Sequence, residues 1–288
     1  MNSVIDEMLK NYVVNTIDDQ INVAKEILQE IILCGLSRAG FFDKVAFYGG
    51  TALRLFYGLE RFSEDLDFSL KKPDLNFRLE QYFPLLTKEV ASYGLQAEFE
   101  EKKKTADSKI QSAFLKGNTL QHMMFFYGGE RSNFHIPANQ VIKVKFEVDI
   151  DPPPLAQYEH RMKLLPSPHE VMLYDLPSLF AGKLHAVICR AWKHRTKGRD
   201  LFDYIFYLQR GARPNMPHLR AKLLASKVIG ESDRFDMEVL QTMLAERFAN
   251  IDYESAKRDV FDFVSDKAAL SYWSASFFQT ITKEYLKE

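Results

Sequence analysis

The stretch Val45-Ala46-Phe47-Tyr48-Gly49-Gly50-Thr51 decides how the first half of this chain folds. Its four leading residues are apolar or aromatic and predict a short buried strand, which the two glycines bring to an end. The segment from Thr51 to Tyr57 has the alanine, leucine and arginine content of a short helix, and Gly58 ends it. Backbone N–H groups at the start of such a helix are unpaired, and glycines let a phosphate approach them closely. A lone pair of glycines is nevertheless more typical of a plain strand-to-helix turn.

Two aspartates beyond this turn change the interpretation. Leu66 to Leu70 predicts a second strand, and residues two apart on a strand share a face, so Asp65 and Asp67 point the same way. Two carboxylates directed at one point repel each other unless a cation lies between them. Oxygen ligands suit Mg²⁺ or Mn²⁺, and Mg²⁺ completes its shell with water and substrate phosphates. We therefore expect a divalent metal ion at Asp65 and Asp67, and a nucleoside triphosphate at residues 49–51. The alternative is a solvated strand face.

A third acid would allow the site to hold two metal ions, the arrangement used for in-line displacement at phosphorus. The segment from Val141 to Ile150 alternates apolar and charged residues and predicts a strand. Glu147 and Asp149 lie on its polar face, so either of them is a candidate metal ligand. The spacing does not choose between the two.

A third cluster follows on segments that have helical character. Lys183 lies in a mostly apolar stretch, where a lysine needs a partner. Residues 190–199 contain five lysines and arginines and no acid, and Asp200 and Asp203 follow at a spacing of three. A basic loop of this kind, which ends at Arg199, could clamp a triphosphate or a nucleic-acid backbone. The alternative is a solvated loop between helices.

The domain organisation follows from one break in the pattern. The run Asp151-Pro152-Pro153-Pro154 must end the preceding strand, because proline cannot continue a ladder of hydrogen bonds. We expect an α+β protein with a domain of strands and helices over residues 1–155 and a helical domain over residues 156–288, with no strand after Pro166. The remaining elements expected in the first domain are helices at 17–38 and 76–93 and strands at 95–100 and 120–127.

Composition narrows the class of protein and its location. The 288 residues have 46% hydrophobic content and a formal net charge of −1, so a folded core is expected and a general attraction to nucleic acid is not. The N-terminus is acidic and polar, unlike a signal peptide, and no apolar run approaches the roughly 20 residues that span a bilayer. We therefore expect a cytoplasmic protein without a membrane partner.

Taken together, the clusters resemble the AbiEii/AbiGii toxin family of nucleotidyltransferases, which includes the MenT-type toxins and belongs to the DNA polymerase β-like superfamily. The resemblance covers roughly residues 40 to 210, and its motifs are specific only in combination. They are Phe47-Tyr48-Gly49-Gly50-Thr51-Ala52-Leu53-Arg54-Leu55, Arg61-Phe62-Ser63-Glu64-Asp65-Leu66-Asp67-Phe68, Lys145-Phe146-Glu147-Val148-Asp149, Gly182-Lys183-Leu184-His185-Ala186 and Lys197-Gly198-Arg199-Asp200-Leu201-Phe202-Asp203.

The resemblance implies roles that spacing alone does not give. Residues Gly49, Gly50 and Thr51 would hold the nucleoside triphosphate, and Asp65 and Asp67 the metal. Lys183 would reach the phosphates, helped by the basic loop at Arg199, and Asp200 would complete the site. The family fold is a small mixed sheet flanked by helices, with a helical domain attached. Members of the family act as toxins in toxin–antitoxin and abortive-infection systems, usually beside a separate antitoxin protein, and some add nucleotides to the 3′ end of tRNA.

The expected reaction is the transfer of a nucleoside monophosphate from a triphosphate to an acceptor hydroxyl, such as the 3′ end of an RNA. Two alternatives keep the same nucleotide site. One is a kinase, which would transfer the γ-phosphate to a protein or a small molecule. The other is a partner protein that binds a nucleotide without turnover, although such a protein has no reason to gather repelling carboxylates on one strand face.

Overall fold

A computed structural model of the chain describes residues 3–102, 108–118, 126, 141–191, 196–264 and 266–287. These residues form two compact units. Unit 1 consists of Met1–Ala52, Phe62–Pro152 and His160–Leu173. Unit 2 consists of Leu53–Arg61, Pro153–Glu159 and Tyr174–Glu288. The chain therefore passes between the units several times, and the predicted single boundary after residue 155 remains a prediction.

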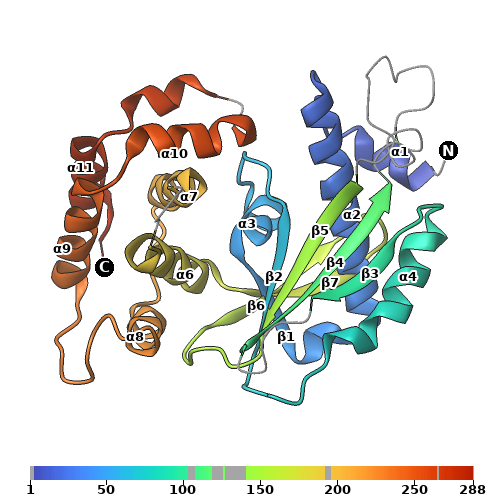
Figure 1. Ribbon diagram of the computed structural model, residues 1–288, viewed down its shortest axis with the longest axis horizontal. Coiled ribbons are helices and arrows are strands. Elements are labelled where there is room, and N and C mark those ends of the chain that lie inside the picture. The colour runs from blue at the N-terminus through green and yellow to red at the C-terminus, as the bar shows by residue number, and fades with distance from the viewer. Residues whose placement is uncertain are drawn as a thin grey trace. The chain divides into compact units, whose positions relative to one another are not determined.

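The described residues of unit 1 are built on a mixed sheet of seven strands in the order β3-β4-β5-β2-β1-β7-β6 (Figure 1). Neighbours are antiparallel in the pairs β1/β2, β3/β4 and β4/β5, and parallel in β2/β5 and β1/β7. The strand bounds are β1 Val45–Tyr48, β2 Asp65–Leu70, β3 Glu98–Lys102, β4 Ile110–Asn118, β5 Val141–Asp149, β6 Tyr158–Lys163 and β7 His169–Tyr174.

One face of this sheet is apolar and is covered by helices. Helices α2 (Ile17–Arg38) and α4 (Phe83–Ser92) lie beside each other against it, and α1 (Ser3–Leu9) contacts α2 (Figure 1). Phe68 of β2 and Val148 of β5 are fully buried and paired in register. Because side chains alternate along a strand, Asp65 and Asp67 must lie on the opposite face. The fold of unit 1 thus separates the apolar core from the candidate acids.

Helix α2 shows how local sequence fixes an element. The Thr16 hydroxyl accepts a hydrogen bond from the Asp19 N–H, and the Asp19 carboxylate accepts one from the Thr16 N–H, so the two residues form a capping box. The helix starts and ends where the apolar periodicity of the sequence predicts.

Unit 2 is helical. Helix α3 (Gly49–Tyr57) starts in unit 1 and ends in unit 2, and the described residues of unit 2 contain six further α-helices. They are α6 Leu176–Cys189, α7 Gly198–Gln209, α8 Met216–Ala225, α9 Met237–Ala249, α10 Tyr253–Val260 and α11 Ala275–Tyr285. Their core is aromatic: Phe180 stacks on Tyr207 at 4.4 Å between ring centroids, and Phe248 packs on Phe278 at 5.1 Å. None of the described helices is both long enough and apolar enough to cross a membrane.

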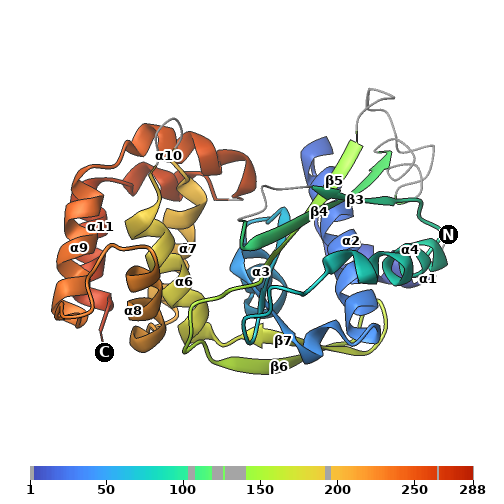
Figure 2. The ribbon, with the colours of Figure 1, turned by 60° about the horizontal axis from the view of Figure 1, so that its bottom comes forward.

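The predicted α+β class is confirmed, but some elements were predicted wrongly. Strands β6 and β7 follow the triple proline and extend the sheet (Figure 2), so the expectation of no strand after Pro166 is wrong. The helix expected over residues 76–93 is shorter, because Pro84 occupies its first turn and α4 begins at Phe83. A short 3₁₀ helix, Leu79–Tyr82, precedes it. The strand expected over 120–127 lies outside the described residues, apart from the buried Phe126.

Candidate active site

The glycine turn at residues 49–51 lies next to the strand that carries Asp65 and Asp67, and both are in unit 1. Strand β1 ends at Tyr48, which pairs in register with Asp67 of β2, and α3 begins at the next residue. Gly49 has a φ of +85°, a conformation that side chains with a Cβ rarely adopt. A Cβ at Gly49 would also lie 2.6 Å from Oδ2 of Asp67, which is far inside van der Waals contact. The Asp67 carboxylate therefore rests against the backbone of the turn, and only glycine fits there.

Thr51 links the same turn to β2. Its side chain is buried, and its Oγ1 donates a hydrogen bond of 2.5 Å to the Asp65 carbonyl. The hydroxyl was predicted to contact a nucleotide, and in the structure its proton is already used by the backbone. This hydrogen bond holds the start of α3 against the strand that carries both aspartates.

The register of β2 against β5 distinguishes the two candidate third acids. The strands are parallel, and Asp67 pairs with Glu147 while Ser69 pairs with Asp149. Cross-strand partners in register lie about 5 Å apart and on the same face. Glu147 is therefore the acid directly beside Asp67. Asp149 lies beside Ser69, so it is further than Glu147 from both Asp65 and Asp67.

A lysine lies among these acids. Lys145 pairs in register with Asp65, and its Nζ is 2.7 Å from Oε2 of Glu147. Burial opposes its charge, but Glu147, Asp65 and Asp67 together outweigh burial, and the pKa of Lys145 is raised. The other Glu147 oxygen, Oε1, accepts a hydrogen bond of 2.9 Å from the Ser112 hydroxyl. The acids thus already attract one positive charge to this face.

Asp65, Asp67 and Glu147 all offer carboxylate oxygens, and such ligands fit a hard divalent cation. Among the described residues, however, no group of three or more histidine, cysteine, aspartate or glutamate side chains is arranged as a metal site. A metal ion would therefore have to compete with the Lys145 ammonium for Glu147. The assignment of Asp65, Asp67, Glu147 and Asp149 as metal ligands remains a prediction.

Lys183 and Asp200, the other predicted catalytic residues, meet within unit 2. Lys183 on α6 places its Nζ 2.7 Å from Oδ1 of Asp200 and 2.8 Å from Oδ2 of Asp203. Both aspartates are on α7, which packs against α6 (Figure 1). Asp203 is fully buried, and Arg61 binds both of its oxygens at 2.7 Å. A bidentate pair of this kind fixes a guanidinium in both position and direction. The network therefore joins α6, α7 and the segment that follows α3.

The remaining cation of this network is Arg190, which caps α6. Its Nη1 donates to Oδ2 of Asp200 at 2.5 Å, and its side chain is about half exposed. Burial would raise the pKa of Asp200, but Lys183 and Arg190 overcome it and lower that pKa to about 2. Asp200 is consequently ionised throughout the neutral range. Three cations then surround two carboxylates, which leaves the network with a net positive charge.

Comparison with known proteins identifies the family. The model of the nucleotidyl transferase AbiEii toxin family, type IV toxin–antitoxin system, matches residues 31–279. The chain belongs to the AbiEii family. It is therefore a nucleotidyltransferase of the toxin type. No curated protein matches the chain.

Two crystal structures from Helicobacter pylori are similar to this AbiEii chain. JHP933 is 21% identical, with a TM-score of 0.49, and the match covers 92% of this chain and 93% of JHP933. A second protein, proposed to be a nucleotidyltransferase, is 21% identical with a TM-score of 0.48, and the match covers 91% of this chain and 94% of that one.

The predicted basic loop of this AbiEii protein is only partly described. Residues 192–195 lie outside the described residues, whereas Arg199, the loop residue predicted to bind the nucleotide, is described. Its guanidinium lies over the Phe263 ring, 4.5 Å from the centroid, and its Nε is 4.0 Å from Oδ2 of Asp259. Arg199 is thus engaged within unit 2, and its contact with a nucleotide remains a prediction.

Three contacts of the candidate residues, one in unit 2 and two in unit 1, were not foreseen from the sequence. Arg61 pairs with Asp203 across 142 positions of the chain, and no local pattern announces such a pair. Lys145 and Ser112 both bind Glu147, and only the pairing of β4 with β5 brings Ser112 there. The alternation of charge along β5 was a usable signal for Lys145, because it lies two residues from Glu147 on the same face.

Proposed function

We propose that this AbiEii protein transfers a nucleoside monophosphate from a nucleoside triphosphate to the 3′ hydroxyl of an RNA, with the end of tRNA as the expected acceptor. The transfer would release pyrophosphate and would use Mg²⁺ or Mn²⁺. The protein would act in the cytoplasm, and a separate antitoxin would oppose it. One observation carries the proposal: the Asp67 carboxylate rests against Gly49 and lies beside Glu147 in register.

Each residue of unit 1 has a distinct part in this proposal. The backbone N–H groups at Gly49 and Gly50 would bind phosphate oxygens at the start of α3, where the helix dipole favours negative charge. Asp65, Asp67 and Glu147 would hold the metal ions, with Asp149 as the alternative third ligand. When bound, the metal ions would lower the pKa of the attacking hydroxyl and offset charge on the leaving pyrophosphate. Glu147, directly beside Asp67, is the acid that we favour to orient the acceptor hydroxyl.

Unit 2 would contribute positive charge. Lys183 donates to both Asp200 and Asp203, so its ammonium has a fixed direction, and its side chain retains 13% exposure. A preorganised ammonium stabilises charge that develops in a transition state without the cost of reorienting solvent. Asp200 would position Lys183 and Arg190 together. Because Asp200 already binds both of these cations, we favour a positioning role for it over a role as a metal ligand.

The test is a labelling experiment with the purified protein, total RNA, Mg²⁺ and each α-labelled nucleoside triphosphate in turn. We expect label in RNA with at least one nucleotide. Asp67→Asn should lower the rate by about 100-fold or more, since electrostatic groups at a reacting phosphate commonly contribute that much. Glu101→Gln, which removes an exposed acid of β3 in the same unit, is the matched control and should keep the rate. Full activity in Asp67→Asn would overturn the proposal.

Further readouts separate the alternatives and test the metal requirement. A kinase would leave the α-label on the released diphosphate, so mass spectrometry is applied to the acceptor from a parallel reaction with unlabelled triphosphate, where it distinguishes a nucleotide adduct from the far lighter phosphate. Repeating the reaction with a chelator in place of Mg²⁺ tests the metal requirement. Sequencing of the labelled RNA then identifies the acceptor and the added base. A product that carries only phosphate, or transfer that continues in the chelator, would contradict the proposal.

A further inference from the structure

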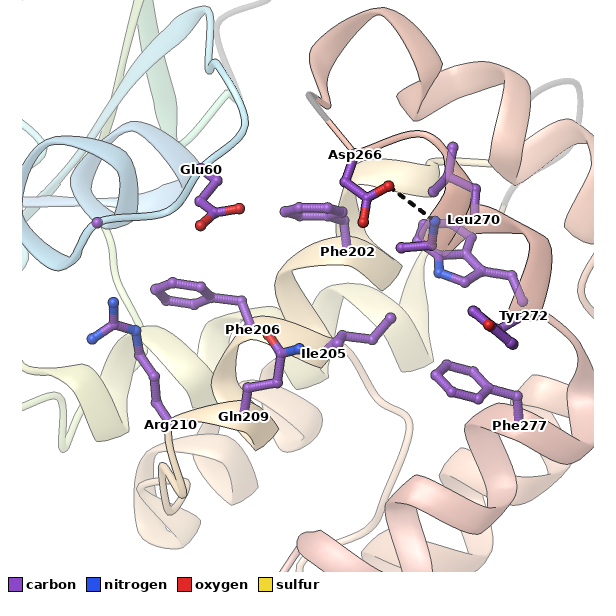
Figure 3. A pocket seen from close by; sticks show the side chains of 13 residues that line it. Glu60, Phe202, Ile205, Phe206, Gln209, Arg210, Asp266, Leu270, Tyr272 and Phe277 are labelled. Carbon is purple, nitrogen blue, oxygen red and sulfur yellow. Dashed lines mark hydrogen bonds between the residues drawn. The ribbon is translucent and has the colours of Figure 1, made fainter.

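A pocket of about 580 Å³ lies wholly within unit 2 (Figure 3). Its lining comes from the loop after α3, from α7 with Arg210 after it, from residues 266–273, and from Phe277 on α11. The volume falls within the range of about 300–1,000 Å³ that is usual for sites of small organic ligands. None of the residues assigned to nucleotide transfer lines it.

The walls of this pocket are rich in aromatic side chains. They are Phe202, Phe206, Tyr272, Trp273 and Phe277. Tyr272 is 71% exposed, and large aromatic side chains that remain open to solvent around a hollow commonly mark a binding site. An aromatic ring attracts a cation to its face through its quadrupole.

The charged groups of the pocket are two acids and one base. Glu60 and Asp266 are the acids, and the base is Arg210. The Arg210 guanidinium already lies over the Phe206 ring at 4.5 Å from its centroid. Asp266 uses one carboxylate oxygen to accept from the Ala268 N–H at 3.0 Å. Neither acid forms a salt bridge with a cation among residues 3–102, 108–118, 141–191, 196–264 and 266–287.

We infer that this pocket binds an organic cation, a guanidinium or ammonium group carried on an apolar body. Figure 3 shows the Glu60 carboxylate directed toward the pocket, with the Phe202 ring between Glu60 and Asp266. A cation over the Phe202 face would have a carboxylate on either side. The pocket already contains one such cation–aromatic contact, because the Arg210 guanidinium lies over the face of Phe206. The apolar body of the ligand would rest on Ile205 and Phe277.

The charge balance disfavours a nucleotide at this position. Phosphate groups would meet two carboxylates, whereas the lone guanidinium of the lining is held on Phe206. The same cationic chemistry occurs in free small molecules and in the arginine side chains of proteins, and the experiment below separates these two sources. The inference stands independently of nucleotide transfer.

The test is calorimetric titration of the full chain at low salt with Nα-benzoyl-arginine amide. Nα-benzoyl-citrulline amide is the matched control ligand, because it has the same shape without the charge. We expect the citrulline compound to bind more weakly than the arginine compound by about tenfold or more, because hydrogen bonds between charged groups contribute on that scale. Glu60→Gln and Asp266→Asn should each weaken the arginine compound about tenfold, and Asp266→Asn retains the oxygen that binds Ala268. Glu246→Gln, an exposed acid on α9 outside the pocket, should bind like the unaltered protein.

A capped peptide containing the pair Phe-Arg is titrated in parallel. Tighter binding of the peptide than of the small compound identifies the arginine side chain of a protein partner as the source. Equal or weaker binding of the peptide identifies a free small cation. Equal affinity for the arginine and citrulline compounds, or unchanged affinity in both acid variants, would overturn the inference. Displacement of the arginine compound by a single-stranded RNA oligonucleotide, with tighter RNA binding in Glu60→Gln, would overturn it in favour of nucleic acid.

Discussion

Replacing Gly49 by alanine tests the link between the turn and the acids. At a φ of +85°, a residue with a Cβ costs about 1–2 kcal/mol in backbone strain. The new Cβ would also stand 2.6 Å from Oδ2 of Asp67, so the carboxylate must move, and forcing a side chain off its rotamer costs about 1 kcal/mol more. The Gly49→Ala variant should therefore lose about 2–3 kcal/mol of unfolding free energy. Displacement of Asp67 by about 1 Å should lower nucleotide transfer about 100-fold.

Gly211→Ala is the matched control. Gly211 has a φ of +61°, but a Cβ there would meet nothing within 4 Å, so only the backbone strain of about 1–2 kcal/mol applies. Urea unfolding followed by circular dichroism gives the stability of both variants, and the labelling assay gives their activity. If Gly49→Ala kept the same transfer rate as Gly211→Ala, the reasoning that Asp67 depends on this glycine would be refuted.

Three predictions concern unit 2. Asp203→Ala should lower the unfolding free energy by about 3–5 kcal/mol, because it removes the carboxylate that the buried Arg61 binds through two hydrogen bonds; a urea-unfolding loss below 1 kcal/mol would contradict this. The depressed pKa of Asp200, about 2, means that its ionisation stabilises the folded state by about 2 kcal/mol. That contribution is complete above about pH 5 and is lost as the pH falls toward about 2, so Asp200→Asn should flatten the dependence of stability on pH in this window. An equally steep fall in the variant would refute the assignment. Gly182→Ala should raise the unfolding free energy by up to about 1 kcal/mol, since the position lies within α6 and a Cβ there meets nothing within 4 Å; a loss of stability would show an unrecognised constraint.

The elements that were predicted well carry their signals locally. Helix α2 has a capping box at Thr16 and apolar residues at helical spacing, and β5 alternates strictly between buried side chains and side chains that are partly or fully exposed. The turn at Gly49 was predicted from two glycines that follow four apolar residues. In each case the residues that determine the element lie close to one another in the sequence.

The elements that were missed depend on distant partners or on one residue. Strand β6 is an edge strand and is almost wholly polar, so it shows no apolar alternation. Strand β7 does alternate, with Val171 and Leu173 buried and Glu170 exposed, and this signal was overlooked after the triple proline. Pro84 should have shortened the helix predicted over residues 76–93.

The candidate site was predictable in its residue types and not in its pairings. The sequence places Asp65 and Asp67 on one face, but the neighbour of Asp67 is set by the register of β2 against β5, which joins residues 80 positions apart in the chain. The engagement of Lys183 by two aspartates is likewise a product of packing between α6 and α7. Sequence spacing offers two candidates for the third acid, and strand register favours Glu147.

The most direct measurement of the central claim compares the nucleotide-transfer rates of Glu147→Gln and Asp149→Asn with that of the unaltered protein. Glu147 lies beside Asp67 in register, whereas Asp149 lies beside Ser69. We predict that Glu147→Gln lowers the rate about 100-fold or more, and that Asp149→Asn changes it by no more than a few-fold. Circular dichroism of each variant confirms that both remain folded. A folded Glu147→Gln variant that transfers nucleotide at the normal rate would contradict the proposed site.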